Sequence, residues 1–393
     1  MSNAMNRRVL SLCTQGNREV IRKSLSAAEY KVSFISAQSE VTPSIAAFKP
    51  RVLVHDWDAI EHSQTMKFHL NFSHTSQAID LFRVLVVPEI TPSILAFASD
   101  ALVEKVITIG NASLNLGNEL DMMVASIDGN ELATFMRELK SGEFRYDQTE
   151  IDRRVTDLHE RYPHDPRIKL EFGNLAFRQG QYPEAENMAQ TLLKKEPQNM
   201  RAMNLLAKCF MKQGKWEQSL NCIAAAQGLS PQNPERLILM GDALYGKGDL
   251  DKAMACYQEA IDIDPSVKDL AHKQMGQVHL AKGKVEEALE LFKGSMSEEE
   301  SAGFFNNAAV HAVREGKIEE AITLYNTALK ALVTDKLKPF IYFNLALSHR
   351  RLGQAEDAVK CLKRALHYNP GYEKARVHLD SILKPVRKLQ KAS

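Results

Sequence analysis

Residues 200–231 read MRAMNLLAKCFMKQGKWEQSLNCIAAAQGLSP, and the pattern of this stretch recurs over more than half of the chain. Apolar residues recur in it every three or four positions, and Gly214 separates two such runs, so we expect two amphipathic helices joined by a tight turn. Gly180, Gly214 and Gly248 lie 34 residues apart. A period of 34 residues predicts a stack of helix–turn–helix units. The prolines that follow the second run keep the same step: Pro197, Pro231 and Pro265.

Six such units fit the sequence. The eighth position of each unit is Gly or Ala, which lets its two helices approach closely, and a glycine at position 15 breaks the turn. In four of the six units a proline at position 32 ends the second helix. The spacing slips in the later units, around Ser301–Gly303 and Thr334–Lys338. The units begin at Pro166, Met200, Pro234, Asp269, Ala302 and Pro339.

On these residues the helical part resembles an array of six tetratricopeptide repeats over residues 166–372. The resemblance implies an α-helical solenoid whose first helices line a groove that binds peptides. Residues 125–165 are expected to form linker helices and a degenerate half-repeat. Residues 373–393 are expected to form a capping helix and a basic tail, with six Lys or Arg against two acids.

The first part of the chain has a different periodicity. Five β-rich runs alternate with amphipathic segments, and several runs are apolar throughout, which is typical of strands buried on both faces of a parallel sheet. We therefore expect an α/β domain over residues 5–124 with a doubly wound, five-stranded parallel sheet. Residues 1–4 resemble a cloning scar and are left outside it. The expected strands are 9–12, 31–35, 52–54, 84–87 and 106–109, and the expected helices are 17–29, 41–48, 92–101 and 114–124.

The order of elements in residues 5–124 resembles the receiver domain of bacterial response regulators (CheY-like). The stretch 49–56 has the shape of that family's third strand, where an aspartate at the strand end accepts a phosphoryl group. Asp56 falls on that position. The resemblance also implies an acidic pair after the first strand that holds a divalent cation, yet Cys13 and Thr14 stand there.

Other positions of the receiver set depart as well. Pro88 stands where a Thr or Ser is expected, and Ile109-Gly110 where a lysine followed by proline is expected. Two interpretations remain. In the first, which we favour because the groups that stabilise the transferring phosphoryl are missing, Asp56 is the relic of a pseudo-receiver. In the second, Asp56 takes phosphate with Mg²⁺ held partly by Asp58. Mg²⁺ is the one cofactor considered, and only in that case.

A cluster of histidines and acids between residues 55 and 74 invites a metal hypothesis. The histidines are spaced by seven, seven and five, so they do not share a helical face as an i, i+4 pair of ligands would. No metal site is predicted. The cluster consists of His55, His62, His69 and His74 with Asp56, Asp58 and Glu61.

The groove positions of the repeats carry an excess of positive charge. Nine of them are Lys or Arg, against the two acids Glu235 and Asp242. A basic groove suits an acidic peptide or a C-terminal carboxylate. The alternative is that acids of adjacent repeats pair with these cations and cancel them. The predicted partner-binding residues are Arg167, Asn174, Arg178, Arg201, Asn204, Lys208, Lys212, Lys273, Asn306, Arg314, Arg350 and Arg351, with Gln277 beside them.

Composition narrows the classes of function. The 393 residues carry 50 Lys and Arg against 49 Asp and Glu, so bulk attraction to nucleic acid or a membrane surface is not expected. The chain has five cysteines, a small and uneven number, which argues against a disulfide framework and indicates a reducing cytoplasm. Three of them, Cys222, Cys256 and Cys361, share position 23 of their repeats and are expected to fill small buried slots. No nucleophilic, P-loop or dinucleotide-binding motif points to an enzyme.

The sequence thus predicts a bacterial, cytoplasmic, non-catalytic scaffold of the two-component type. The solenoid is expected to bind a protein partner, with no nucleic acid or membrane involved. The receiver-like half is expected to serve for docking or as a homodimer surface. The alternative is a response regulator in which phosphorylation at Asp56 controls partner binding by the repeats.

Overall fold

The computed structural model describes residues 7–57, 68, 81–101, 103–127, 131–141, 147–231 and 233–390. Its contacts divide the chain into two compact units, Met1–Lys247 and Gly248–Ser393. The first unit holds the α/β part together with the repeats as far as the first helix of the third repeat. The second unit holds the rest of the helices. The division therefore falls inside a repeat and not between the α/β part and the repeats.

A five-stranded parallel sheet forms the α/β part, with the strand order β2-β1-β3-β4-β5. Every residue of β3 and β4 is buried, because helices cover both faces of the sheet. The predicted parallel sheet and its five strands are confirmed. The strands are β1 (Arg8–Leu12), β2 (Lys31–Ile35), β3 (Val52–Asp56), β4 (Phe82–Val87) and β5 (Lys105–Thr108).

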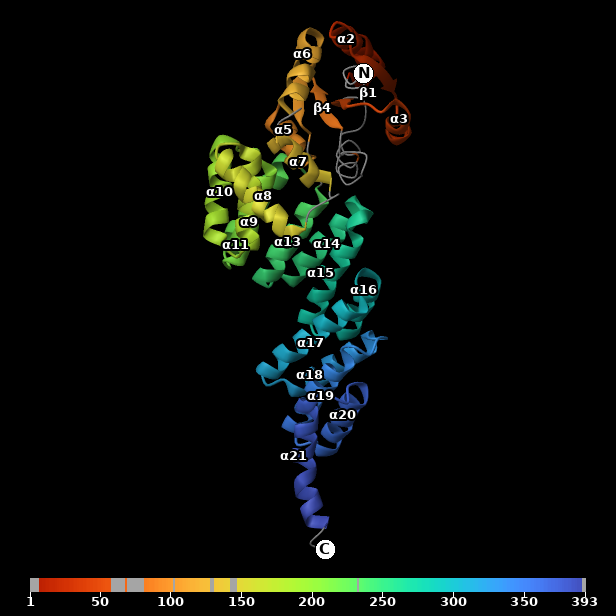
Figure 1. Cartoon of the computed structure of the whole chain (residues 1–393), viewed down its shortest axis with the longest axis vertical. Helices are drawn as coiled ribbons and strands as arrows, with labels where there is room; N and C mark the ends of the chain where they lie inside the picture. Colours follow the sequence, from red (N-terminus) through yellow and green to blue (C-terminus); the bar gives the residue numbers. More distant parts are fainter. Residues whose placement is uncertain are drawn as a thin grey trace. The chain divides into compact units, whose positions relative to one another are not determined.

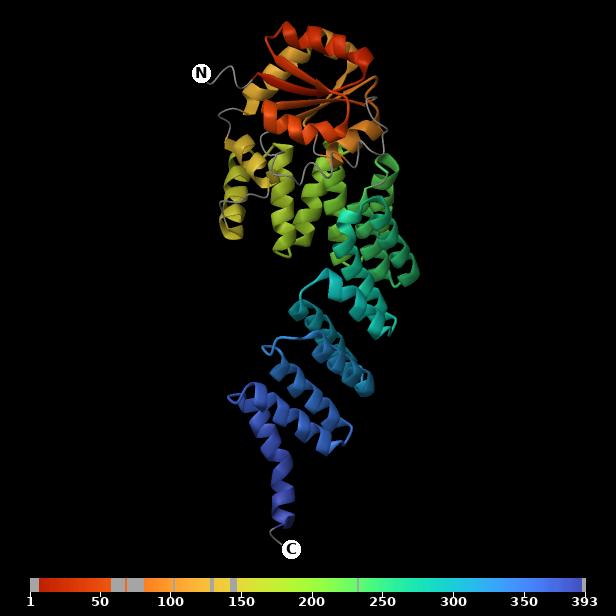
Figure 2. The ribbon, with the colours of Figure 1, turned by 90° about the vertical axis from the view of Figure 1, so that its right-hand side faces the viewer.

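The two faces of the sheet hold alternate residues of each strand. Val52 and Val54 of β3 pack with helices α2 (Gln15–Ser26) and α6 (Ile109–Ile127) on one face. On the other face lie α3 (Val41–Phe48), which packs on Leu53, and α5 (Pro92–Asp100), which packs on Leu85 of β4. Figure 2 shows the strands between these two layers of helices.

Two helix starts in this part differ in how well the sequence predicts them. Thr91 is the N-cap of α5: its hydroxyl accepts a hydrogen bond from the backbone N–H of Ile94 at 3.3 Å, and Pro92 follows it in the first turn. Helix α6 begins at Ile109, directly after β5 and five residues before the predicted start. The apolar Val106–Ile109 run looks like one strand, but its last residue already belongs to the helix.

Helices alone follow the sheet in the described part of the chain (Figure 1). Those of the first unit are α7 (Glu131–Ser141), α8 (Gln148–Arg161), α9 (Pro166–Arg178), α10 (Tyr182–Lys195), α11 (Met200–Lys212), α12 (Trp216–Leu229) and α13 (Pro234–Lys247). Those of the second unit are α14 (Leu250–Ile263), α15 (Lys268–Ala281), α16 (Val285–Ser295), α17 (Glu298–Arg314), α18 (Ile318–Ala331), α19 (Lys338–Arg351), α20 (Ala355–Tyr368) and α21 (Glu373–Gln390). The helical repeat pattern is confirmed, and a further helix, α21, follows the last repeat.

The repeated glycines explain the turns within repeats. At position 15 of all six repeats the backbone is left-handed, with φ between 71° and 96°. Gly214 shows the hydrogen bonds of such a turn: its own N–H donates to the carbonyl of Met211, and the N–H of Lys215 donates to the carbonyl of Phe210. At position 8, a Cβ on Gly276 would lie 2.3 Å from a ring carbon of Phe292, so the paired helices are too close for a larger residue.

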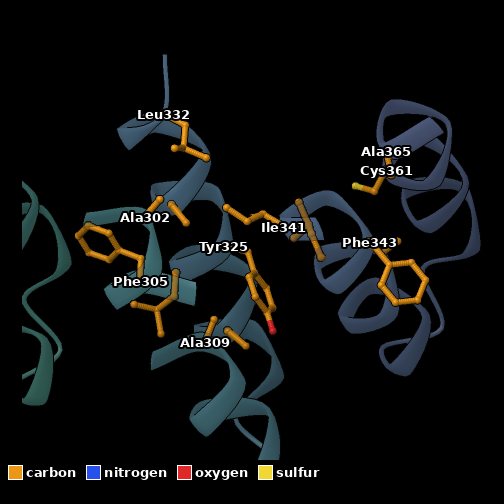
Figure 3. Close-up of a cluster of buried hydrophobic side chains, with 14 of the residues drawn as sticks. Ala302, Phe305, Ala309, Tyr325, Leu332, Ile341, Phe343, Cys361 and Ala365 are labelled. Atoms are coloured by element: carbon orange, nitrogen blue, oxygen red, sulfur yellow. The ribbon is translucent and has the colours of Figure 1, made fainter. Parts of the chain in front are cut away.

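The core of the second unit lies between helices α17, α18, α19 and α20 (Figure 3). Phe305 of α17 is fully buried there, and Tyr325 of α18 and Ile341 of α19 point into the same cluster. Ala375 of α21 is buried against it, so the last helix covers the end of the stack as a cap does. In the described residues, no helix combines the length and the apolar composition that a membrane span requires.

Candidate functional site

Asp56 lies at the carboxyl end of β3, where the receiver resemblance places it, and is 1% exposed. One carboxylate oxygen, Oδ2, accepts three hydrogen bonds. The donors are the backbone N–H of Thr14 at 3.0 Å, the hydroxyl of Thr14 at 2.8 Å and the side-chain amide of Asn17 at 2.8 Å. The carboxylate therefore ties the end of β3 to the segment between β1 and α2.

The same residues form the start of α2. Thr14 is the N-cap of this helix, and its hydroxyl also accepts from the backbone N–H of Asn17 at 3.4 Å. Because the first turn of a helix presents unpaired N–H groups and a positive dipole end, it stabilises a nearby carboxylate. Thr14 occupies a position of the acidic pair implied by the resemblance. There it donates hydrogen bonds to Asp56 and supplies no negative charge.

This arrangement fits a structural carboxylate better than a magnesium site. Mg²⁺ prefers an octahedral set of oxygen ligands that includes carboxylates. Around Asp56 the described residues supply hydrogen-bond donors to Oδ2, and the Cys13 thiol beside them is buried. Burial raises the pKa of that thiol. No group of three or more His, Cys, Asp or Glu suited to a metal occurs in the part of the chain that the structure describes.

The neighbours of Asp56 are also buried. His55 is fully buried, and this burial lowers its pKa to about 4, although the charge of Asp56 opposes the shift. Trp57 packs edge-to-face on Phe97 of α5, with 5.1 Å between the ring centroids. Pro88 follows the end of β4. Asp58, Glu61, His62, His69 and His74 lie outside the described residues.

Four of the predicted groove cations form ion pairs. Arg178 pairs with Asp152 of α8 at 2.7 Å, and Arg201 pairs with Glu171 of α9 at 2.5 Å, so these two contacts cross between helices. Lys273 pairs with Glu300 of α17. Arg167 pairs with Asp165 at the start of its own helix, at 2.8 Å. At these positions acids cancel the charge, as the alternative interpretation of the groove expects.

Five other predicted cations are exposed and form no ion pair with a carboxylate among the described residues: Lys208, Lys212, Arg314, Arg350 and Arg351. Arg350 contacts the ring nitrogen Nδ1 of His378 at 3.0 Å, and Arg351 donates to the carbonyl of Val313 at 3.4 Å. Positive charge thus remains on α11 in the first unit and at the ends of α17 and α19 in the second.

The predicted polar groove residues take different positions. Asn174 donates to Glu171 at 3.2 Å, and Gln277 donates to Gln274 at 2.6 Å. The side-chain oxygen of Asn204 is buried without a hydrogen-bond partner in the described structure. Asn306 accepts a hydrogen bond from Asn344 of α19 at 3.2 Å, so the first helices of repeats five and six meet at this pair.

Two of the three position-23 cysteines differ from the expectation of buried slots. Cys361 is buried, while Cys222 and Cys256 are only partly buried, and all five cysteines are free. Cys222 is close enough to the carbonyl of Met203 for its thiol to donate a hydrogen bond, at 3.4 Å. Burial raises the pKa of Cys222 and of Cys361 to about 11. None of these thiols has the lowered pKa that a nucleophile needs.

The sequence interpretation missed one polar contact, between α5 and the repeats of the first unit. Arg236 of α13 forms an ion pair with Asp100 of α5, and both side chains are at most 2% exposed. Close by, the backbone N–H of Met200 donates to the hydroxyl of Ser99 at 3.1 Å. A residue of the sequence does indicate this contact: a charged side chain stands at position 3 of one repeat, where the other repeats have apolar residues. Arg236 is the only charged residue there, among Ile168, Ala202, Ala271, Phe304 and Ile341.

Family models match most of the helical part. Residues 170–234 and 270–335 match one tetratricopeptide repeat model, residues 241–270 match a second, and residues 339–372 match a third. The predicted tetratricopeptide repeats are therefore confirmed. The matches do not extend into the α/β part, where the receiver resemblance stays a prediction. No curated protein matches the sequence.

Solved structures with partial similarity include other helical proteins. A chain of the APC/C hetero-tetramer Cut9–Hcn1 is 14% identical, over 75% of this chain and 56% of that one, with a TM-score of 0.37. MamA from Desulfovibrio magneticus RS-1 is 22% identical, over 41% of this chain and 88% of that one, with a TM-score of 0.33. A tetratricopeptide repeat protein from Parabacteroides merdae is 14% identical, over 67% of this chain and 98% of that one, with a TM-score of 0.38. At these scores the similarities carry no functional conclusion.

Proposed function

We propose that this chain is a non-catalytic signalling scaffold whose tetratricopeptide repeats bind an acidic segment of a protein partner. Tetratricopeptide repeats generally mediate contacts between proteins. The observation that carries the acidic preference is the set of exposed groove cations without a carboxylate partner among the described residues, on α11 and at the ends of α17 and α19. Such cations attract acidic side chains and guide their approach.

The receiver-like half serves in this proposal as a docking or dimerisation surface of a two-component type of protein. Support comes from Asp56, whose carboxylate is engaged by Thr14 and Asn17 in a structural role. Further support comes from α5, which contacts the repeats of the same unit through Asp100 and Ser99. The α/β half then adds a second surface to a protein whose repeats hold the partner.

Charge reversal tests the binding proposal. The full chain is used to capture proteins from the lysate of its source organism, with and without Lys208, Lys212, Arg350 and Arg351 changed to Glu. A matched control changes four exposed lysines on second helices, Lys293, Lys330, Lys360 and Lys363, to Glu. The proposal expects captured proteins to be lost with the groove variant and kept with the control. Equal capture by both variants, at low and at high salt, contradicts it.

A second candidate function is a phosphorylation-responsive regulator with Asp56 as the acceptor. The position of Asp56 at a strand end favours it, as does the strand order 2-1-3-4-5, which doubly wound nucleotide- and phosphate-related folds share. The contacts to Oδ2 and the missing acidic pair oppose it. Mass spectrometry of the intact chain after incubation with acetyl phosphate and Mg²⁺ separates the two functions. A phosphoryl adduct that disappears in Asp56→Asn supports the regulator; no adduct supports the scaffold.

A further inference from the structure

The first helices of the last two repeats lie alongside each other in the second unit. Near their middle, Asn344 of α19 donates to Asn306 of α17 at 3.2 Å. Near their ends, Arg351 of α19 donates to the carbonyl of Val313 at 3.4 Å. Beside these contacts, Phe305 of α17 and Ile341 of α19 belong to the buried core, so the core lies next to this surface (Figure 3).

One stripe of α19 faces the same way along its length. Phe340, Asn344, Leu347 and Arg351 are spaced by four, three and four residues, so they share one face of the helix. Eleven residues of α-helix span about 16 Å. We call this stripe, together with Asn306 and Arg314 of α17, the C-terminal inner face.

One end of the C-terminal inner face is apolar. Phe340 is 48% exposed, which makes it one of the exposed large apolar residues of the described structure. Its ring contacts Tyr372 edge-to-face, with 5.4 Å between the centroids, and Tyr372 also contacts Phe343 at 5.2 Å. This aromatic group presents one ring to solvent while its neighbours hold that ring in place.

The other end is positively charged. Arg351 bonds to the carbonyl of Val313, the residue before Arg314, so the two guanidinium groups come from adjoining helix ends. Both are exposed, and neither forms an ion pair among the described residues. The nearby acid Glu315 is engaged by Lys317 at 2.8 Å. The charge at this end is thus left for a ligand, unlike that of Arg178 and other paired cations.

We infer that the C-terminal inner face binds an extended peptide with a large apolar side chain at one end and carboxylates about five residues away. An extended chain advances about 3.3 Å per residue, so about five residues cover the 16 Å between the apolar and the charged end. The apolar side chain packs on Phe340 and Tyr372, and the carboxylates take bidentate hydrogen bonds from Arg314 and Arg351. Asn306 and Asn344, which share one hydrogen bond, offer amide groups to the peptide backbone between them.

This inference rests on the proposed function and adds the place and the chemistry of the ligand. Fluorescence anisotropy with the full chain tests it. The probe is a labelled seven-residue peptide, blocked at both ends, with Leu first, Glu sixth and seventh, and Ser and Gly between. Three control peptides change Leu to Ser, change both Glu to Gln, or shorten the spacer to one residue. We expect the probe to bind at least tenfold more tightly than each control.

Variants locate the binding. Arg314→Glu with Arg351→Glu, and separately Phe340→Ser, are expected to weaken probe binding at least tenfold. Lys360→Glu with Lys363→Glu makes the same change of charge on α20, outside the predicted groove residues, and is expected to leave probe binding unchanged. If Lys208→Glu with Lys212→Glu on α11 weakens binding and the two C-terminal variants do not, this inference is wrong and the acidic-peptide groove stands. The inference is also overturned if the probe does not bind, or if all four peptides bind equally. The scaffold function is tested separately, by capture of proteins from the lysate.

Discussion

Arg236 and Asp100 form a buried ion pair although 136 residues separate them in the sequence. The guanidinium also donates to the backbone carbonyls of Ala226 and Ser230, so its charge is held by several acceptors at once. Buried charges of this kind require full pairing, because each one loses its hydration. The pair therefore fixes α5 of the α/β part against the repeats of the first unit.

Removing one partner of this pair is expected to destabilise the first unit strongly. Asp100→Ala leaves Arg236 charged and buried, which costs about 3–5 kcal/mol of unfolding free energy. The double variant Asp100→Ala, Arg236→Met is expected to recover most of the loss, since other repeats carry an apolar residue at this position. Urea denaturation measures both. Glu150→Ala, which breaks an exposed pair with Arg153, serves as the control and should leave the free energy of unfolding nearly unchanged.

Asp56 is expected to contribute to stability. Asp56→Ala removes a buried carboxylate and leaves the partly buried donors of Thr14 and Asn17 without their acceptor, which costs about 1–3 kcal/mol. Asp56→Asn keeps an acceptor oxygen and should cost less. Thermal and urea unfolding compare the two variants with the parent chain. An increase in stability on removing the carboxylate would instead mark Asp56 as a functional residue held at the expense of stability.

Gly276 and Gly303 form a matched pair of helical glycines. A Cβ on Gly276 would meet the ring of Phe292, whereas no atom lies within 4 Å of a Cβ on Gly303. Gly276→Ala is therefore expected to lower the free energy of unfolding by about 1–3 kcal/mol through overpacking. Gly303→Ala is expected to be neutral or to stabilise by up to about 1 kcal/mol, because Ala favours helix. Equal effects at both positions would contradict the close approach of the helices.

His55 predicts a pH dependence of stability. Its pKa in the folded chain is lowered to about 4, from 6.5, because burial disfavours the charged ring. The unfolded chain then binds more protons between these two values, so stability is full above pH 6.5 and falls as the pH drops toward 4. The loss amounts to about 3 kcal/mol at 1.36 kcal/mol per pKa unit. Urea titrations at pH 7.5, 5.5 and 4.5 should show a flatter dependence for His55→Gln than for the parent chain.

The cysteines are expected to react slowly in the folded chain. Burial raises the pKa of Cys222 and Cys361 to about 11, so at pH 8 about one thiol in a thousand is a thiolate. Reaction with Ellman's reagent should be slow at pH 8 in the folded chain. In guanidinium chloride all five thiols should react rapidly. Rapid labelling of one cysteine under native conditions would reveal an exposed, activated thiol and reopen a catalytic role.

The repeats can be predicted from local sequence alone, because each Gly at position 15 is needed for one turn and each small residue at position 8 for one pair of helices. Local sequence also determined the strands, since apolar runs such as those of β3 and β4 can only be buried on both faces. The position of Asp56 at the end of β3 agrees with what the receiver resemblance of residues 49–56 implied.

The tertiary structure decided what each charged side chain does. Arg201 and Arg351 occupy groove positions that look alike in the sequence, yet Glu171 neutralises the first and no carboxylate of the described residues meets the second. Likewise, Thr14, the N-cap of α2, donates two hydrogen bonds to Asp56, and Asp100 is the counter-ion of Arg236. Such pairings join residues from distant parts of the chain, and electrostatic energy depends on distance and burial in space, which the order of residues does not contain.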